Sequence, residues 1–92
     1  MKITLVSVAD LREYFGRAPV ELQLPEGATL REVLAEVDHR WGAQLPGYLW
    51  EREQQRFRGP IFLLVDKKVV LDFATALCDG QEVVVMHALA GG

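Results

Sequence analysis

Alternating apolar and polar positions predict a β-strand at the beginning of the chain. Residues 2–8 (KITLVSV) are rich in β-branched side chains, which favour an extended backbone. Successive side chains of a strand point to opposite faces, so Ile3 and Leu5 share one face while Val6 and Val8 share the other. Both faces of this strand are therefore largely apolar.

Further strands are expected at intervals along the chain. Each is a short run of apolar or alternating residues bounded by turn residues, as is typical of β-structure. These strands cover residues 20–24 (VELQL), 61–65 (IFLLV), 69–71 (VVL) and 82–89 (EVVVMHAL). Between the first two strands, residues 9–16 (ADLREYFG) have apolar side chains at helical spacing and end in glycine, which predicts a short helix.

One stretch predicts a long helix. Thr29 and Glu32 have the spacing of a capping box, in which the two residues satisfy free backbone donors at the start of a helix. A single apolar stripe follows and ends before Gly42; it consists of Leu30, Val33, Leu34, Val37 and Trp41. Residues 43–60 contain Pro-Gly and Gly-Pro pairs and only one weak helical pair, Trp50 and Phe57, so we expect a long loop with one helical turn.

This order of elements predicts an α+β fold in one domain, residues 1–92, with a mixed sheet covered on one face by the long helix. One helix covers only one face. If Ile3, Leu5, Val83 and Val85 face the helix, the opposite face carries Val6, Val8, Val84 and Met86. An apolar open face in a small protein marks a partner surface. The alternative is that the loop of residues 43–60 folds over it.

Composition narrows the range of functions. Half of the 92 residues are apolar, a quarter are charged, and the net charge is -3. This balance is typical of a globular protein and argues against nucleic-acid binding, which requires an excess of Lys and Arg. The chain has no apolar run long enough to span a membrane, and its start does not resemble a secretory signal, so a cytoplasmic location is expected.

Candidate catalytic residues are scarce. Cys78 is the only cysteine, which excludes an intramolecular disulfide and a cysteine metal pair, and we expect a small packed thiol. His39 and His87 lack the spacing of metal ligands. Neither a metal site nor a bound cofactor is expected, and nothing indicates an enzyme. The feature that requires explanation is the final Gly91-Gly92 pair, which directly follows the last predicted strand.

Several motifs, in their order, resemble the ubiquitin-like sulfur carriers of the MoaD/ThiS family, most closely the small subunit of molybdopterin synthase. They are LRE (residues 11–13), LPEGATLREVL (24–34), LCDGQEV (77–83) and the terminal AGG (90–92). The resemblance covers the whole chain and implies the β-grasp fold.

The resemblance also implies a function for the tail. At neutral pH the Gly92 carboxylate is an anion and must be activated before a nucleophile attacks it. In the family an adenylating enzyme of the ubiquitin-activating type, which binds the ATP, does this, and the terminus becomes a thiocarboxylate. Gly91 keeps the tail slender. We expect Val8, Met86, Leu89 and Ala90 to contact partner enzymes.

The pathway stays open at this point. The resemblance favours molybdopterin synthesis, with the large molybdopterin synthase subunit as the sulfur-accepting partner, ahead of thiamin or cysteine synthesis. A ubiquitin-like modifier joined to lysines through Gly92 is the alternative from a different class of function, and an interaction domain with incidental glycines is a third.

Overall fold

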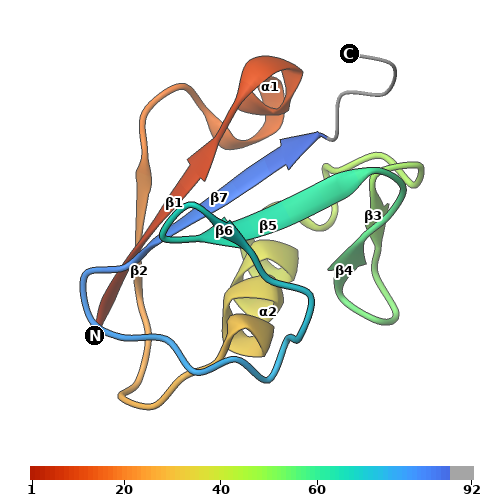
Figure 1. The fold of residues 1–92 in the computed structure, drawn as a ribbon. Coiled ribbons are helices and arrows are strands. Elements are labelled where there is room, and N and C mark those ends of the chain that lie inside the picture. The colour runs from red at the N-terminus through yellow and green to blue at the C-terminus, as the bar shows by residue number, and fades with distance from the viewer. Residues whose placement is uncertain (88–92) are drawn as a thin grey trace.

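The computed structural model describes residues 1–87 and contains a five-stranded sheet with one long helix packed across one face (Figure 1). The strands lie in the order β2-β1-β7-β5-β6. Their bounds are Lys2–Ser7 (β1), Val20–Gln23 (β2), Ile61–Val65 (β5), Lys68–Val69 (β6) and Glu82–His87 (β7). Strand β7 is parallel to β1 and antiparallel to β5, so the sheet is mixed, and the predicted fold class is confirmed.

The long helix α2, Leu30–Trp41, begins and ends where the sequence predicts. Both halves of the capping box at Thr29 and Glu32 are present. Four stripe residues are completely shielded from solvent and pack against the inner face of the sheet: Leu30, Val33, Leu34 and Val37. The helix and the sheet therefore form the centre of the core, to which the sheet contributes Ile3, Leu5, Leu22, Leu63, Val65, Val83 and Val85.

The short helix lies between β1 and β2. A 3-10 turn, η1 (Ala9–Leu11), continues into α1 (Arg12–Phe15), and the chain leaves at Gly16 with a φ of 92°. Few residues other than glycine adopt such a positive φ, which explains why the helix ends there. Leu11 and Phe15 anchor this segment in the core.

Within residues 43–60, residues 50–57 form a short β-hairpin, which the prediction of a long loop with one helical turn did not include. Strand β3 (Trp50–Glu51) pairs with β4 (Arg56–Phe57). Trp50 and Phe57 are seven positions apart, which is also a helical spacing, but here they lie directly opposite each other across the hairpin. Their rings meet edge to face with centroids 4.8 Å apart.

A carboxylate on α2 holds this hairpin against the helix. Asp38 Oδ1 accepts a hydrogen bond of 2.8 Å from the indole N–H of Trp50 and one of 3.2 Å from Nε of Arg52. Asp38 Oδ2 lies 3.5 Å from the amide nitrogen of Gln55. These donors lower the pKa of Asp38, with the Trp50 hydrogen bond as the largest cause and the Arg52 hydrogen bond next. The hairpin thus packs beside α2, on the helix side of the sheet (Figure 1).

The segment between β6 and β7 returns along the lower edge of the helix. It is tied to the start of α2 by backbone hydrogen bonds from Leu30 to Thr75 and from Leu77 to Ala28. Leu77 points into the core, so the next side chain along the extended backbone, Cys78, points outward. Cys78 is exposed, and the expectation of a packed thiol was wrong.

Candidate functional site

The candidate site is the end of strand β7, because this strand delivers the chain to the Gly-Gly tail. Strand β7 is the central strand of the sheet and is held on both sides, by β1 and by β5. Its last residue, His87, directly precedes Ala88. The expected site residues Leu89, Ala90, Gly91 and Gly92 lie outside the described residues, so their roles remain predictions.

The end of β7 lies beside the turn that follows β1. The parallel register pairs Ser7 with Val85, and one residue further along each strand are Val8 and Met86. Both side chains are partly exposed. The two partner-binding residues expected within the described part of the chain are therefore at the same end of the sheet, next to the base of the tail.

A histidine and a carboxylate also meet at this end. His87 Nε2 lies 3.3 Å from Asp10 Oδ1 of η1, without the geometry of a hydrogen bond. The contact becomes an ion pair when the imidazole is protonated. Asp10 is exposed while His87 is mostly covered, so η1 packs against the last described residue of β7.

The face of the sheet opposite α2 carries an apolar surface, which we call the open face. Its residues sit opposite one another across neighbouring strands, since Val6 pairs with Val84, Met86 with Phe62, and Leu64 with both Val84 and Val69. Paired residues point to the same side of a sheet. The open face therefore consists of Val6, Phe62, Leu64, Val69, Val84 and Met86.

Part of this surface is exposed to solvent. Phe62 is 38% exposed and Val69 is 53% exposed, and Val6, Leu64, Val84 and Met86 are partly exposed. The alternative that the loop of residues 43–60 folds over this face was wrong. Leu45, Leu49 and Trp50 of that segment are instead buried in the core on the helix side.

Sequence reasoning placed Val6, Val8, Val84 and Met86 on the open face but did not name Phe62, Leu64 or Val69. The run IFLLV is apolar at every position, so the sequence does not show which of its residues face outward; the structure buries Leu63 and Val65 and turns Phe62 and Leu64 to the other face. The apolar surface was therefore underestimated on the β5 side.

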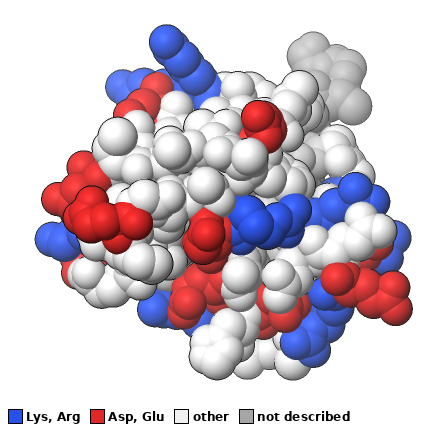
Figure 2. All heavy atoms as spheres, turned by 90° about the horizontal axis from the view of Figure 1, so that it is seen from below, with Lys and Arg blue, Asp and Glu red and all other residues white. Residues whose placement is uncertain are grey.

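On the face seen from below, charged residues form no large region of one sign (Figure 2). Figure 2 shows Lys and Arg interspersed with Asp and Glu over much of the visible surface, beside a broad area with few charges. Within residues 1–87, His, Cys, Asp and Glu form no group of three or more that could hold a metal ion. No helix in this part of the chain is long and apolar enough to cross a membrane.

Comparison with solved structures finds close matches to the fold. SAMP1 from Haloferax volcanii matches with a TM-score of 0.79 at 20% identity, and the match covers 100% of both chains. A putative molybdopterin converting factor subunit 1 from Pyrococcus furiosus matches with a TM-score of 0.72 at 23% identity, over 96% of this chain and 98% of that chain. These two likenesses show the fold.

A chain of the BexX/CysO complex from Amycolatopsis orientalis matches at 26% identity with a TM-score of 0.71, over 98% of this chain and 99% of that chain. A search of curated protein sequences finds no match. The sequence profile of the ThiS family matches residues 7–92, which is nearly the whole chain. The resemblance seen in the motifs is thereby confirmed, and the chain belongs to the ThiS family of ubiquitin-like sulfur carriers and modifiers.

Proposed function

We propose that this protein is a cytoplasmic sulfur carrier whose Gly92 carboxylate is converted to a thiocarboxylate. The observation that carries the proposal is the position of the tail, which follows a central strand held on both sides and begins beside the open face. The tail is therefore attached to a strand whose last described residue, His87, is paired with Ile61 of β5. The two terminal glycines have no side chains to obstruct a narrow channel in a partner enzyme.

The chemistry has two steps, and both take place in partner enzymes. First, the Gly92 carboxylate attacks the α-phosphorus of ATP, which forms an acyl-adenylate and releases pyrophosphate. Second, a sulfur nucleophile at the oxidation level of sulfide attacks the acyl carbon, and AMP leaves with its bonding electron pair. One oxygen of the carboxylate is then replaced by sulfur. The carrier acts as a co-substrate and supplies no catalytic side chain.

The open face is the surface that we propose for docking to these partners. Met86 lies at its tail-proximal end with Val8 beside it, and the other apolar residues of the open face give a contact area that loses water on binding. The likeness to a chain of the BexX/CysO complex supports a protein partner of this kind. Leu89 and Ala90 are proposed to extend the same contact into the partner.

We further propose that the sulfur goes to molybdopterin, with the large molybdopterin synthase subunit as the acceptor. The motif resemblance and the likeness to the converting factor subunit from Pyrococcus furiosus support this pathway. A thiazole-forming or cysteine-forming enzyme would be the acceptor in the two other pathways. Activity with each acceptor distinguishes them, because the loaded carrier transfers its sulfur only where the acceptor's channel admits the tail.

Intact-mass spectrometry tests the sulfur carrier proposal. The full chain is incubated with an adenylating enzyme of the ubiquitin-activating type, ATP and sulfide, and the expected product has one terminal oxygen exchanged for sulfur. A chain lacking Gly91 and Gly92 is the matched control and should remain unchanged in mass. A modifier would instead appear as a Gly-Gly remnant on lysines of other proteins. An unaltered mass in the full chain, with adenylation shown by pyrophosphate release, would contradict the sulfur carrier role.

A further inference from the structure

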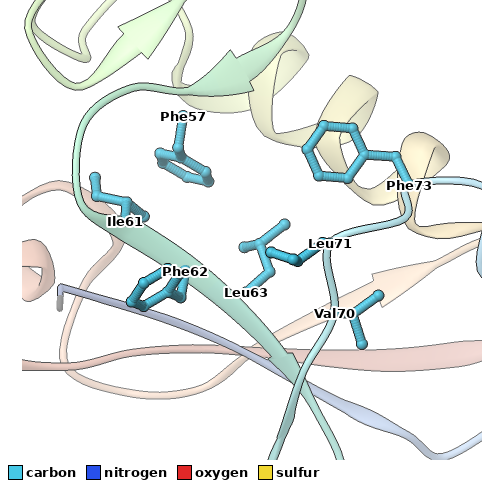
Figure 3. Close-up of a pocket in the computed structure, with 7 residues that line it drawn as sticks. All are labelled: Phe57, Ile61, Phe62, Leu63, Val70, Leu71 and Phe73. Atoms are coloured by element: carbon cyan, nitrogen blue, oxygen red, sulfur yellow. The ribbon is translucent and has the colours of Figure 1, made fainter.

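A small apolar pocket lies against strand β5, mainly on its helix side, and its lining includes Phe62, which also belongs to the open face. It has a volume of about 100 Å³. Its lining comes from β4, from β5 and from the segment after β6, and consists of Phe57, Ile61, Phe62, Leu63, Val70, Leu71 and Phe73. Figure 3 shows the rings of Phe57 and Phe73 turned toward the space above β5, and Leu71 directed toward Leu63.

The pocket continues into a second recess that carries charge. Phe57, Leu71 and Phe73 line both hollows, so the two form one groove. The second recess adds Arg56 and Arg58, together with Glu51 and Gly59. Leu71 is 80% exposed at the junction of the two hollows, so the groove is accessible from solvent.

The charged recess has an excess of positive charge. Arg56 Nε and an outer nitrogen of Arg58 lie 3.3 Å and 3.9 Å from the same oxygen of Glu51, Oε2. One carboxylate thus faces two guanidinium groups, each about half exposed. A guanidinium has five N–H donors, so most of the donors on both arginines are left for another acceptor. A second carboxylate would complete the charge balance of this recess.

The groove therefore fits a ligand with an aliphatic side chain followed by a carboxylate. A volume of about 100 Å³ equals that of roughly three water molecules, which suits the four carbons of one leucine side chain. A guanidinium group binds a carboxylate through two parallel N–H···O hydrogen bonds. The chain itself contains this combination at its end, where Leu89 precedes the Gly92 carboxylate by three residues.

We propose that the groove binds the C-terminal segment of a second copy of this chain, with Leu89 in the apolar pocket and the Gly92 carboxylate at Arg56 and Arg58. An extended stretch of three residues spans roughly 10 Å, so the two groups of the tail can reach two adjoining hollows. The contact is head to tail, because the groove and the tail are different parts of the molecule.

The position of β7 favours a second copy over the same molecule. His87 pairs with Ile61 on the β7 side of strand β5, whereas the pocket opens on the other side, toward the segment after β6. Leu89 is only two residues beyond His87. To fill its own pocket, Leu89 would have to pass the β5 backbone at Ile61 within two residues of His87.

This inference goes beyond the sulfur carrier proposal and does not depend on it, since it requires only a free carboxylate at Gly92. A tail held in the groove of another copy is not available to a partner enzyme. The contact consists of one aliphatic side chain and one exposed ion pair, so we expect a dissociation constant on the order of 1 mM. Self-association would then matter only where the protein is concentrated.

The first experiment follows the full chain by ¹⁵N-¹H NMR as its concentration rises from about 0.05 mM to about 2 mM, a range that brackets the expected constant. Peaks of Ile61, Leu71 and Phe73 should shift with concentration. The sedimentation coefficient should increase in parallel. Peaks that stay fixed over this range would overturn the proposal.

Matched variants then separate the groove from other surfaces. Leu71→Ser should weaken self-association at least fivefold, while Val69→Ser, a similar change on the open face, should leave it unchanged. Arg58→Gln should weaken it at least threefold, and Arg17→Gln, an exposed charge elsewhere, should not. Equal effects of test and control variants would refute the assignment to the groove. All four substituted positions are exposed or half-exposed, so the variants are expected to fold. Unchanged NMR peaks of residues far from each substitution confirm this.

A peptide titration identifies the ligand. The acetylated hexapeptide HALAGG with a free carboxylate, added to dilute full-length protein, should shift the same groove peaks. The C-terminal amide of the same peptide should bind at least threefold more weakly, and so should the peptide with Ser in place of Leu. Equal binding of acid and amide, or shifts confined to the open face, would overturn the proposal. The proposal would also be overturned if the groove peaks changed on replacement of Leu89 in the protein but did not change with protein concentration. Such a result would indicate that the tail docks within one molecule.

Discussion

Replacing Asp38 by Ala should remove the attachment between helix α2 and the β3–β4 hairpin. The indole N–H of Trp50 would lose its acceptor while remaining buried, since Trp50 is only 2% exposed. A buried donor left without a partner costs about 1–3 kcal/mol, and the half-exposed Arg52 contact adds at most about 1 kcal/mol. We expect a loss of about 2–3 kcal/mol, which corresponds to a drop in Tm of roughly 10–20 °C for a domain of this size.

Urea unfolding followed by tryptophan fluorescence measures this loss directly, because Trp50 itself reports the environment of the hairpin. Glu36→Ala is the matched control, since Glu36 lies on the same helix and forms an exposed pair with Arg40 at 2.9 Å. Its effect should stay below about 0.5 kcal/mol. If Asp38→Ala destabilises the protein no more than the control does, the hairpin is held by packing alone and the reasoning is refuted.

The same carboxylate predicts a pH dependence. Because its pKa is lowered in the folded state, Asp38 contributes stability that is present above its unfolded pKa, near ~3.9, and is lost as the pH falls through the folded value. Asp38→Asn keeps an acceptor for Trp50 but cannot ionise. The stability difference between the wild type and Asp38→Asn should therefore be larger at pH 7 than at pH 3. A difference that does not change with pH would contradict this account.

Three further changes test other parts of the structure. Leu34→Ala removes a fully buried side chain of α2 and should cost about 2–5 kcal/mol in urea unfolding; a cost below about 1 kcal/mol would contradict its place in the core. Met86→Glu should leave folding nearly intact but weaken binding to the adenylating enzyme at least tenfold by calorimetry, since a charge is costly at a desolvated contact; unfolding would show that this face is core. Gly91→Val should slow pyrophosphate release more than Gly91→Ala, because a β-branched residue stiffens and thickens the tail; equal rates would refute a narrow channel.

Local sequence signals predicted most of the fold. The capping box at Thr29 and Glu32 fixed the start of α2, and the stripe ending at Trp41 fixed its length, because both depend on residues within a few turns of one another. Period-two alternation likewise assigned Ile3 and Leu5 to the core. These patterns can be read from the sequence without knowing the order of the strands in the sheet.

The parts that were missed depend on contacts between distant residues. The spacing of Trp50 and Phe57 suits one face of a helix as well as a hairpin, and the choice is made by Asp38, twelve positions before Trp50, which takes the indole hydrogen bond. The outward position of Cys78 follows from the burial of Leu77 beneath α2. For the candidate site, alternation identified Met86, but its neighbour Phe62 required the register between β5 and β7.

The central place of β7 has a consequence for how the protein is made. Residues 82–87 join β1 to β5, and their parallel partners in β1 lie at the opposite end of the chain. A nascent chain on the ribosome cannot close the sheet until this strand has emerged, because the pairing spans nearly the whole sequence. A chain that stalls or is cleaved before Glu82 leaves Ile3 and Leu5 without the strand that lies beside them. The sheet can therefore be completed only in a chain whose synthesis has reached the segment that leads into the tail.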